Sequence, residues 1–289
     1  MIPAAAHAAA RALDARARAA APVTGGDVND ALRVTLHDDR TVFVKTPRGV
    51  GGTPAPAGMY AAEARSLEWL ADAGGSAPRV PRVLAAHRDL LVLEWIDARR
   101  PATDHDERLG RGLAALHAAG APGFGGDDGF IATLPLDNTP AATWAEFYGA
   151  RRLEPLVRMG VDTGVLEPGW GRRVERLRAR LPDLMGPAEP PARLHGDLWS
   201  GNAMTDERGG PVLVDPAAHG GSREVDLAMM HLFGGFGARV FAAYAETFPP
   251  APGVEERREL HQLHPLLVHA LLFGGGYVSR AGRAMARYE

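Results

Sequence analysis

Two patterns of hydrophobic residues divide the chain. Between residues 23 and 96, apolar residues alternate with polar ones or form short runs, most clearly at 31–36, 41–45 and 90–96. Such patterns predict β-strands. From residue 104 onward, apolar residues recur at spacings of three and four, which predicts helices. The order of these segments predicts an α+β chain with a strand-rich first part and a larger, mostly helical second part.

The strand-rich part also has two predicted helices. Residues 1–18 are rich in alanine but interrupted by charges, so we expect an amphipathic helix and not a signal peptide. Helical periodicity over 59–72 ends at Gly74 and Gly75, a stop signal. A further strand is predicted at 80–86, a hairpin turn at 37–40 and a loop at 46–58.

A polar, proline-bearing segment after Ile96 is the best boundary between two lobes, 1–97 and 98–289. Beyond it, Asp104 is expected to cap a helix that ends at Gly120. Further helices are predicted at 143–159, 170–181 and 225–233. The stretch 238–288 is predicted helical, with breaks at 248–253 and 274–276. Loops are expected at 121–139, 182–191 and 217–224.

Composition limits the possible functions. The net charge is −3 and there is no cysteine, so nothing indicates nucleic-acid or membrane binding, and disulfides and thiolate metal sites are excluded. No run approaches the ~20 apolar residues of a transmembrane helix. These features fit a cytoplasmic protein.

Lysine is almost absent from the sequence. Of 32 basic residues only Lys45 is lysine, which leaves 32 − 1 = 31 arginines. Either Lys45 survives by chance, or arginine cannot replace it. A compact charge that must reach a phosphate group is one such requirement.

The strongest candidate motif runs from His195 to Asn202. Asp197 is followed five positions later by Asn202, and Asp215 ends a short apolar run thirteen residues after Asn202. An aspartate, an asparagine at plus five and an aspartate after the next strand form the proton-acceptor and Mg²⁺-ligand set of phosphotransferases with a kinase-type catalytic loop. Asp197 is then the expected catalytic residue, and Asn202 and Asp215 the expected metal ligands.

The first lobe supplies the remaining parts of a kinase site. Lys45 lies on a predicted strand, and Glu63 on the following helix is well placed to orient it, with Glu68 as a competitor. Gly25 and Gly26 form a turn that could approach phosphates closely. In a kinase, the segment 94–96 (Glu94, Trp95, Ile96) would be the hinge whose backbone binds adenine.

Several other residues have two interpretations. His195 either takes part in catalysis or hydrogen-bonds the backbone of the turn, and we favour the structural role. Asp226 either balances a helix dipole or is buried to brace the catalytic loop, which we favour. Trp199 either stacks on a sugar or packs the loop. A metal-hydrolase site could recruit His195, Asp197, Asp215 and His219, but the sequence lacks a paired-histidine motif such as H-E-x-x-H, and Lys45 would have no role.

With these residues aligned, the chain resembles the fructosamine kinase (ketosamine kinase) family, relatives of the aminoglycoside phosphotransferases, over nearly its whole length. The stretches that carry the resemblance include Glu63-Ala64-Arg65-Ser66-Leu67-Glu68-Trp69-Leu70, Leu93-Glu94-Trp95-Ile96, Leu194-His195-Gly196-Asp197-Leu198-Trp199-Ser200-Gly201-Asn202 and Leu272-Phe273-Gly274-Gly275-Gly276-Tyr277.

The resemblance implies a bilobal protein-kinase-like fold, with an antiparallel sheet and one main helix in the first lobe. It also implies ATP- and Mg²⁺-dependent phosphorylation of a ketosamine hydroxyl, usually O3, on glycated amines or glycated protein lysines. Where the family usually has aromatic residues, this chain has Ala218-His219-Gly220-Gly221-Ser222, near the expected acceptor. Alternatives are a kinase of another alcohol, such as an aminoglycoside, choline or homoserine, and a nucleotide-binding pseudokinase.

Overall fold

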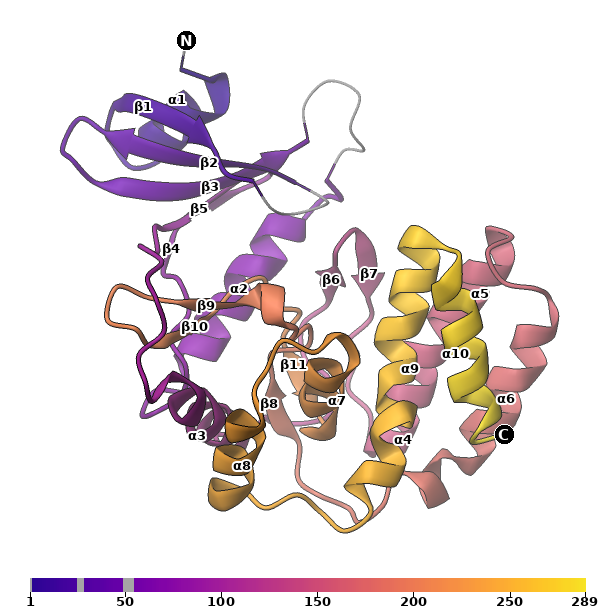
Figure 1. Cartoon of the computed structure of the whole chain (residues 1–289). Coiled ribbons are helices and arrows are strands. Elements are labelled where there is room, and N and C mark those ends of the chain that lie inside the picture. Colours follow the sequence, from indigo (N-terminus) through magenta and orange to yellow (C-terminus); the bar gives the residue numbers. More distant parts are fainter. Residues whose placement is uncertain (1, 25–28, 49–54) are drawn as a thin grey trace.

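The computed structural model describes residues 2–24, 29–48 and 55–289. It has a smaller lobe built on a β-sheet and a larger helical lobe (Figure 1). The predicted glycine turn at Gly25 and Gly26 lies outside the described residues. None of the helices among the described residues has the length and apolar character needed to cross a membrane.

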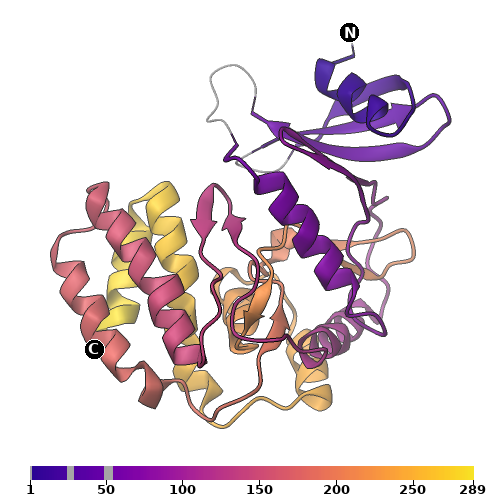
Figure 2. The same cartoon turned by 180° about the vertical axis from the view of Figure 1, so that it is seen from behind.

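The smaller lobe is organised by a five-stranded antiparallel sheet of strand order β1-β2-β3-β5-β4. Helix α1 (Ala4–Arg11) packs on its outer side, and α2 (Met59–Ala71) lies between the sheet and the larger lobe (Figures 1 and 2). The strands are β1 (Ala17–Pro22), β2 (Asn29–Leu36), β3 (Thr41–Pro47), β4 (Val83–His87) and β5 (Leu90–Glu94).

The predicted helix over 1–18 is too long. Helix α1 ends at Arg11, Asp14 adopts a left-handed backbone with φ +52°, and β1 follows. Pairing of β1 with β2 supplies backbone hydrogen bonds that override the helical preference of its alanines. The pattern could not reveal this strand, because β1 is an edge strand and four of its six residues are alanine.

The larger lobe is mostly helical, as predicted. Its helices are α3 (His105–Ala118), α4 (Trp144–Phe147), a π-helical segment η1 (Tyr148–Leu153), α5 (Glu154–Asp162), α6 (Gly169–Leu184), α7 (Glu224–Phe233), α8 (Ala238–Thr247), α9 (Val254–Phe273) and α10 (Gly276–Ala286). Asp104 is the N-cap of α3 by position, although its side chain makes no capping hydrogen bond.

A tyrosine hydroxyl joins the backbone hydrogen bonding of α9. Pro265 lies inside this helix and lacks a backbone N–H. One turn earlier, Tyr148 of η1 donates to the carbonyl of Leu260 at 2.7 Å and accepts the N–H of His264 at 3.2 Å. The π-helical turn therefore fixes α4 and α5 to the helix that borders the functional site.

Three short paired strands lie in segments predicted as loops. The stretch 121–139 contains a hairpin of β6 (Gly129–Ile131) and β7 (Leu134–Leu136). The turn expected at 217–224 contains β11 (His219–Gly221), which pairs with β8 (Ala192–Leu194). Three-residue strands are too short to show a period. The remaining pair, β9 (Ala203–Thr205) and β10 (Pro211–Leu213), lies between Asn202 and Asp215 and links these two residues.

One hydrophobic core joins the lobes. Leu67 and Leu70 of α2 pack in the same buried cluster as Leu109 and Leu113 of α3 and Leu213 of β10. The helix that carries Glu63 is thereby packed against elements of the larger lobe. This packing sets how residues from the two lobes face each other.

Candidate active site

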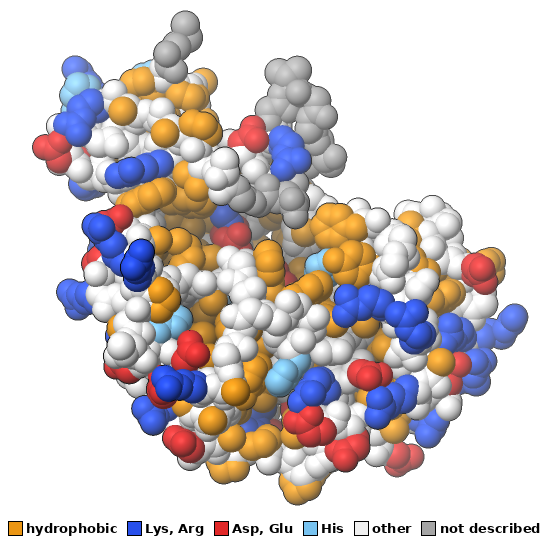
Figure 3. All heavy atoms as spheres, viewed as in Figure 1, with side chains coloured by type: hydrophobic (Ala, Val, Ile, Leu, Met, Phe, Trp, Pro, Cys, Tyr) orange, Lys and Arg blue, Asp and Glu red, His pale blue; other side chains and the backbone are white. Residues whose placement is uncertain are grey.

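A cleft of about 1690 Å³ lies between the two lobes. The molecule is visibly hollowed below the sheet (Figure 3). Both lobes line it, and the lining includes most residues predicted to form the site: Lys45, Glu63, Glu94, Trp95, Ile96, Asp197, Trp199, Asn202 and Asp215.

The alternation of side chains along β3 directs Lys45 into the cleft. Val42 and Val44 are buried on the side covered by α1, whereas Phe43 and Lys45 line the cleft. Lys45 is opposite Ala31 on β2 and Leu91 on β5, so it extends from a central strand. Its position is therefore fixed by the sheet.

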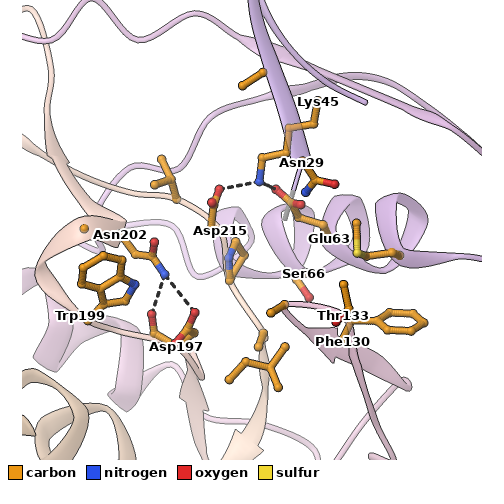
Figure 4. Close-up of a pocket in the computed structure, with 18 of the residues that line it drawn as sticks. Asn29, Lys45, Glu63, Ser66, Phe130, Thr133, Asp197, Trp199, Asn202 and Asp215 are labelled. Carbon is orange, nitrogen blue, oxygen red and sulfur yellow. Dashed lines mark hydrogen bonds and ion pairs between the residues drawn. The ribbon is translucent and has the colours of Figure 1, made fainter. Parts of the chain in front are cut away.

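Lys45 bridges two carboxylates from different lobes. Its Nζ lies 2.7 Å from Oε1 of Glu63 and 2.7 Å from Oδ1 of Asp215 (Figure 4). The side chains of Lys45 and Glu63 are only 7% and 12% exposed, against 48% for Asp215. Glu68, the competing glutamate on α2, is exposed. The structure therefore brings Lys45 together with Glu63.

Burial and charge act in opposite directions on this bridge. Burial alone would lower the pKa of Lys45, but the charges of Asp215 and Glu63 outweigh it and raise the pKa above its ordinary value. Burial raises the pKa of Glu63, although Lys45 opposes this. Lys45 is thus a firmly protonated cation at the boundary between the lobes.

Asp197 and Asn202 form the second cluster in the cleft. Nδ2 of Asn202 donates to the backbone carbonyl of Asp197 at 2.8 Å and to its Oδ2 at 3.2 Å. Burial, followed by the charge of Asp215, raises the pKa of Asp197 to about 7. A carboxylate with this pKa is a better proton acceptor near neutral pH than an ordinary aspartate.

Asn202 and Asp215 have the oxygen donors that Mg²⁺ prefers. Since the amide N–H groups of Asn202 are directed to Asp197, its amide oxygen is left for a ligand. Asp215 is half exposed and has a left-handed backbone, with φ +56°, a strained conformation that is common at functional sites. No cluster of three or more histidine, cysteine or acidic groups suited to a metal occurs in the part of the chain that the structure describes. One carboxylate and one amide oxygen would leave the other positions of a bound Mg²⁺ to water and phosphate oxygens.

Asp226 is fully buried beneath the loop that carries Asp197. Its Oδ2 accepts the backbone N–H of His195 at 2.7 Å and its Oδ1 that of Gly196 at 2.9 Å. Nε2 of His117 also donates to Oδ2, at 3.2 Å. This geometry agrees with the second interpretation of Asp226, as a brace of the loop.

His195 uses both ring nitrogens inside the protein. Nε2 donates to the carbonyl of Val214 at 2.9 Å, and Nδ1 accepts the backbone N–H of Asp197 at 3.3 Å. Burial lowers its pKa. A neutral ring with both nitrogens occupied links the Asp197 loop to the residue before Asp215 and has no free lone pair for a metal.

Trp199 lies on the larger lobe at the wall of the cleft. The indole is 41% exposed, lies over Gly201 and meets the ring of Phe233 edge-on at 6.4 Å. A side chain at position 201 would collide with the indole. Trp199 therefore packs on its own loop and also presents a face to the cleft, so both interpretations stay compatible with its position.

The segment expected as an adenine hinge begins at the last residue of β5 and borders the cleft. Glu94 is held by an ion pair with Arg79, and Ile96 is buried. The ring of Trp95 lies against Phe43 at 6.5 Å, with the Arg33 guanidinium 4.9 Å from its centre.

His219 does not reach the cleft. It is 3% exposed, stacks on Phe147 at 5.7 Å and donates from Nδ1 to the carbonyl of Ala217 at 3.0 Å. Burial lowers its pKa to about 3. The expectation of a substrate contact assumed that closeness to Asp215 in sequence means exposure, but pairing of β11 with β8 turns His219 into the core.

The sequence reasoning missed cleft-lining residues from elements whose relation to the motif was unknown. The hairpin contributes Phe130 and Thr133, which lie near Ser66 of α2 in Figure 4. Helices α7, α9 and α10 contribute Phe233, Val268, His269, Leu272, Phe273 and Tyr277. Several belong to stretches that carry the family resemblance, which was the one available signal.

Comparison with known proteins then decides the family. The model of the fructosamine kinase family matches residues 1–288. The chain belongs to the fructosamine kinase family. A probable ketoamine kinase of Thermus thermophilus is 39% identical over 267 residues, covering 92% of this chain and 93% of the relative. The chloroplastic protein-ribulosamine 3-kinase of Arabidopsis thaliana is 34% identical, covering 90% and 79%.

Solved structures agree with the fold prediction. A protein of Thermobifida fusca provisionally named fructosamine-3-kinase has a TM-score of 0.89 at 42% identity, covering 99% of this chain and 98% of that one. A type I macrolide 2′-phosphotransferase has a TM-score of 0.58 at 17% identity, covering 98% and 95%. The more distant likeness shows the shared fold alone and confirms the predicted bilobal, kinase-like architecture.

Proposed function

We infer that this protein is a kinase that transfers the γ-phosphoryl group of ATP to a sugar hydroxyl of ketosamines. The observation that carries the inference is the meeting of Lys45, Glu63, Asp215, Asp197 and Asn202 in one cleft of a fructosamine kinase family member. The family supplies the reaction class, and the geometry supplies a role for each side chain.

ATP would lie under the sheet, with adenine against the segment 94–96 and its phosphates at Lys45. A cation already protonated and held between Glu63 and Asp215 needs little reorganisation to receive phosphate oxygens. The segment 94–98 is also our proposed boundary between a nucleotide-binding lobe (1–97) and a catalytic lobe (98–289).

Asn202 and Asp215 are the residues that would hold Mg²⁺, through an amide oxygen and a carboxylate. When bound, the ion would neutralise the negative charge that develops on the phosphate oxygens. The alternative metal-hydrolase site has no support in the geometry, because His195 and His219 are buried and hydrogen-bonded to backbone carbonyls.

Asp197 would orient the acceptor hydroxyl and take its proton. The hydroxyl oxygen forms a bond to the γ-phosphorus, the bond from that phosphorus to the bridging oxygen breaks, and ADP leaves. Asn202 holds the Asp197 carboxylate by donating to Oδ2 at 3.2 Å. Positioning and charge, not covalent catalysis, would provide the rate enhancement.

The acceptor hydroxyl is proposed to be O3 of the sugar, on a glycated small amine or a glycated protein lysine. The plant relative is named a protein-ribulosamine 3-kinase, which supports this position. The pseudokinase alternative is disfavoured because pseudokinases usually lack at least one residue of the kinase site. This chain has all four: Lys45, Asp197, Asn202 and Asp215.

An acceptor panel with a coupled ADP assay tests the proposal. Fructosyl and ribulosyl amines are compared with an aminoglycoside, choline and homoserine, and the phosphate on the product sugar is located by NMR. We expect turnover with the ketosamines and phosphate on O3. Turnover only with another alcohol would overturn the substrate class, and ATP binding without turnover on any acceptor would indicate a pseudokinase.

A further inference from the structure

A wall of aromatic rings extends from Trp199 across the larger lobe. The Phe233 ring of α7 lies 6.4 Å from Trp199 and 4.7 Å from His269 of α9, centre to centre. His269 in turn lies 5.6 Å from Phe273 and 5.0 Å from Tyr277 of α10. All five side chains line the cleft, and Phe273 is 55% exposed.

No carboxylate belongs to this wall among the described residues. The acidic residues that line the cleft are on the smaller lobe or are Asp197 and Asp215, while α7, α9 and α10 contribute only uncharged side chains. The guanidinium of Arg280 on α10 adds positive potential at His269, although Arg280 is not among the lining residues. A ligand here therefore meets ring faces and the nitrogen of His269.

The hydrogen bond of His269 fixes which ring nitrogen is free. Nδ1 lies 2.8 Å from the carbonyl oxygen of Pro265, one turn earlier in α9. A carbonyl oxygen can only accept, so Nδ1 carries the proton, and the neutral ring has an acceptor lone pair on Nε2. Burial lowers the pKa of His269, which favours this neutral form. Within the described residues, Nε2 has no hydrogen-bond partner.

We propose that this aromatic wall recognises the ammonium group of the ketosamine, with Nε2 of His269 accepting a hydrogen bond from the ammonium N–H and the rings of Phe233 and Tyr277 facing its charge. Aromatic faces attract cations, and a neutral imidazole nitrogen accepts from N⁺–H. The ammonium is the group that distinguishes a ketosamine from the free ketose. His269 is therefore a specificity-determining residue, and this assignment rests on the proposed function.

The order of residues along the wall suits this substrate. The sugar hydroxyl must reach Asp197, two residues before Trp199 in the chain, so the sugar lies at the Trp199 end. The amine then points toward Phe233 and His269, and its substituent toward Phe273 at the exposed end of the wall. An apolar amine substituent would pack against this aromatic rim.

The test compares two acceptors that differ only at the amine. Fructosyl benzylamine carries the ammonium, and the corresponding benzyl ether has oxygen in its place. In the native protein we expect kcat/KM to favour the amine by about 10-fold or more, the range of a charge-assisted hydrogen bond. In His269→Phe, which keeps a ring but removes the acceptor nitrogen, the preference should fall to about 3-fold or less.

Two further variants separate recognition from damage to the fold. His269→Gln restores an acceptor oxygen near the position of Nε2 and should recover most of the preference. His231→Phe is a matched control, because His231 of α7 stacks on Phe241 at 4.0 Å and does not line the cleft. KM for ATP should be unchanged in all three variants. An unchanged amine preference in His269→Phe would overturn the proposal and assign the ammonium to a catalytic carboxylate.

Failure of the proposed function is recognised separately, as absence of turnover by the native protein with either acceptor. In that case equilibrium binding of the same two compounds, followed by isothermal titration calorimetry, gives the preference without catalysis. A preference for the amine that disappears in His269→Phe would still support the ammonium subsite, and equal binding of the two compounds would overturn it.

Discussion

Replacing Asp226 by alanine should destabilise the protein and disable the loop that carries Asp197. The buried carboxylate accepts the backbone N–H groups of His195 at 2.7 Å and Gly196 at 2.9 Å. In Asp226→Ala both donors lose their partner, and each buried unsatisfied donor costs about 1–3 kcal/mol. The expected loss is therefore about 2–6 kcal/mol, a large share of a typical unfolding free energy of about 5–15 kcal/mol.

Urea denaturation measures this loss, and the coupled ADP assay measures the effect on turnover. We expect a lower midpoint with an unchanged m-value, and a fall in kcat at temperatures where the variant is still folded. Asp183→Ala is the matched control, since Asp183 is an exposed aspartate on α6 and should lose less than about 0.5 kcal/mol. A loss below about 1 kcal/mol in Asp226→Ala would refute the idea that this carboxylate braces the loop.

Three further predictions concern side chains of the cleft and the core. Lys45→Arg should lower kcat at least about 100-fold, because a planar guanidinium cannot replace the compact ammonium between two carboxylates; activity near that of the native protein would contradict the phosphate role. Glu63→Gln should raise KM for ATP about 10-fold, corresponding to about 1.4 kcal/mol, whereas Glu68→Gln should change it less than 2-fold, of order 0.4 kcal/mol; equal effects would be evidence against the Lys45 pairing. Burial lowers the pKa of His261 to about 3, so the folded state resists a proton that the unfolded state binds below about pH 6.5. The contribution of His261 to the free energy of unfolding is fully present above about pH 6.5 and falls by about 1.4 kcal/mol per pH unit on acidification. Urea titrations at pH 7 and 5.5 should therefore show a smaller fall in the free energy of unfolding for His261→Phe than for the native protein.

The residues proposed for catalysis could be picked out from the sequence because they are marked by residue type and spacing. Lys45 is the sole lysine, and Asp197, Asn202 and Asp215 lie close together in the chain. The pairing of Lys45 with Glu63 follows from a strand and a helix that both show clear periods. Residue type, spacing and periodicity can be seen in the sequence itself, without knowledge of the contacts between distant segments.

The parts that could not be predicted depend on contacts between distant segments. Strand β1 is rich in alanine and exists because β2 pairs with it. His219 is buried because β11 pairs with β8, which its neighbours in sequence do not indicate. His269 enters the cleft because α9 packs beside α7 and α10, and a single histidine on an apolar helix gives no sign of this.

Turnover and nucleotide binding by Asp197→Asn test the central claim most directly. Asparagine keeps the size of the side chain but cannot accept the hydroxyl proton as a carboxylate does. We predict that kcat with a ketosamine falls at least about 100-fold, the scale of general-base catalysis, while ATP binding measured by calorimetry stays within about 3-fold, or about 0.7 kcal/mol. Native-like turnover by Asp197→Asn would contradict the role of Asp197 and the mechanism built on it.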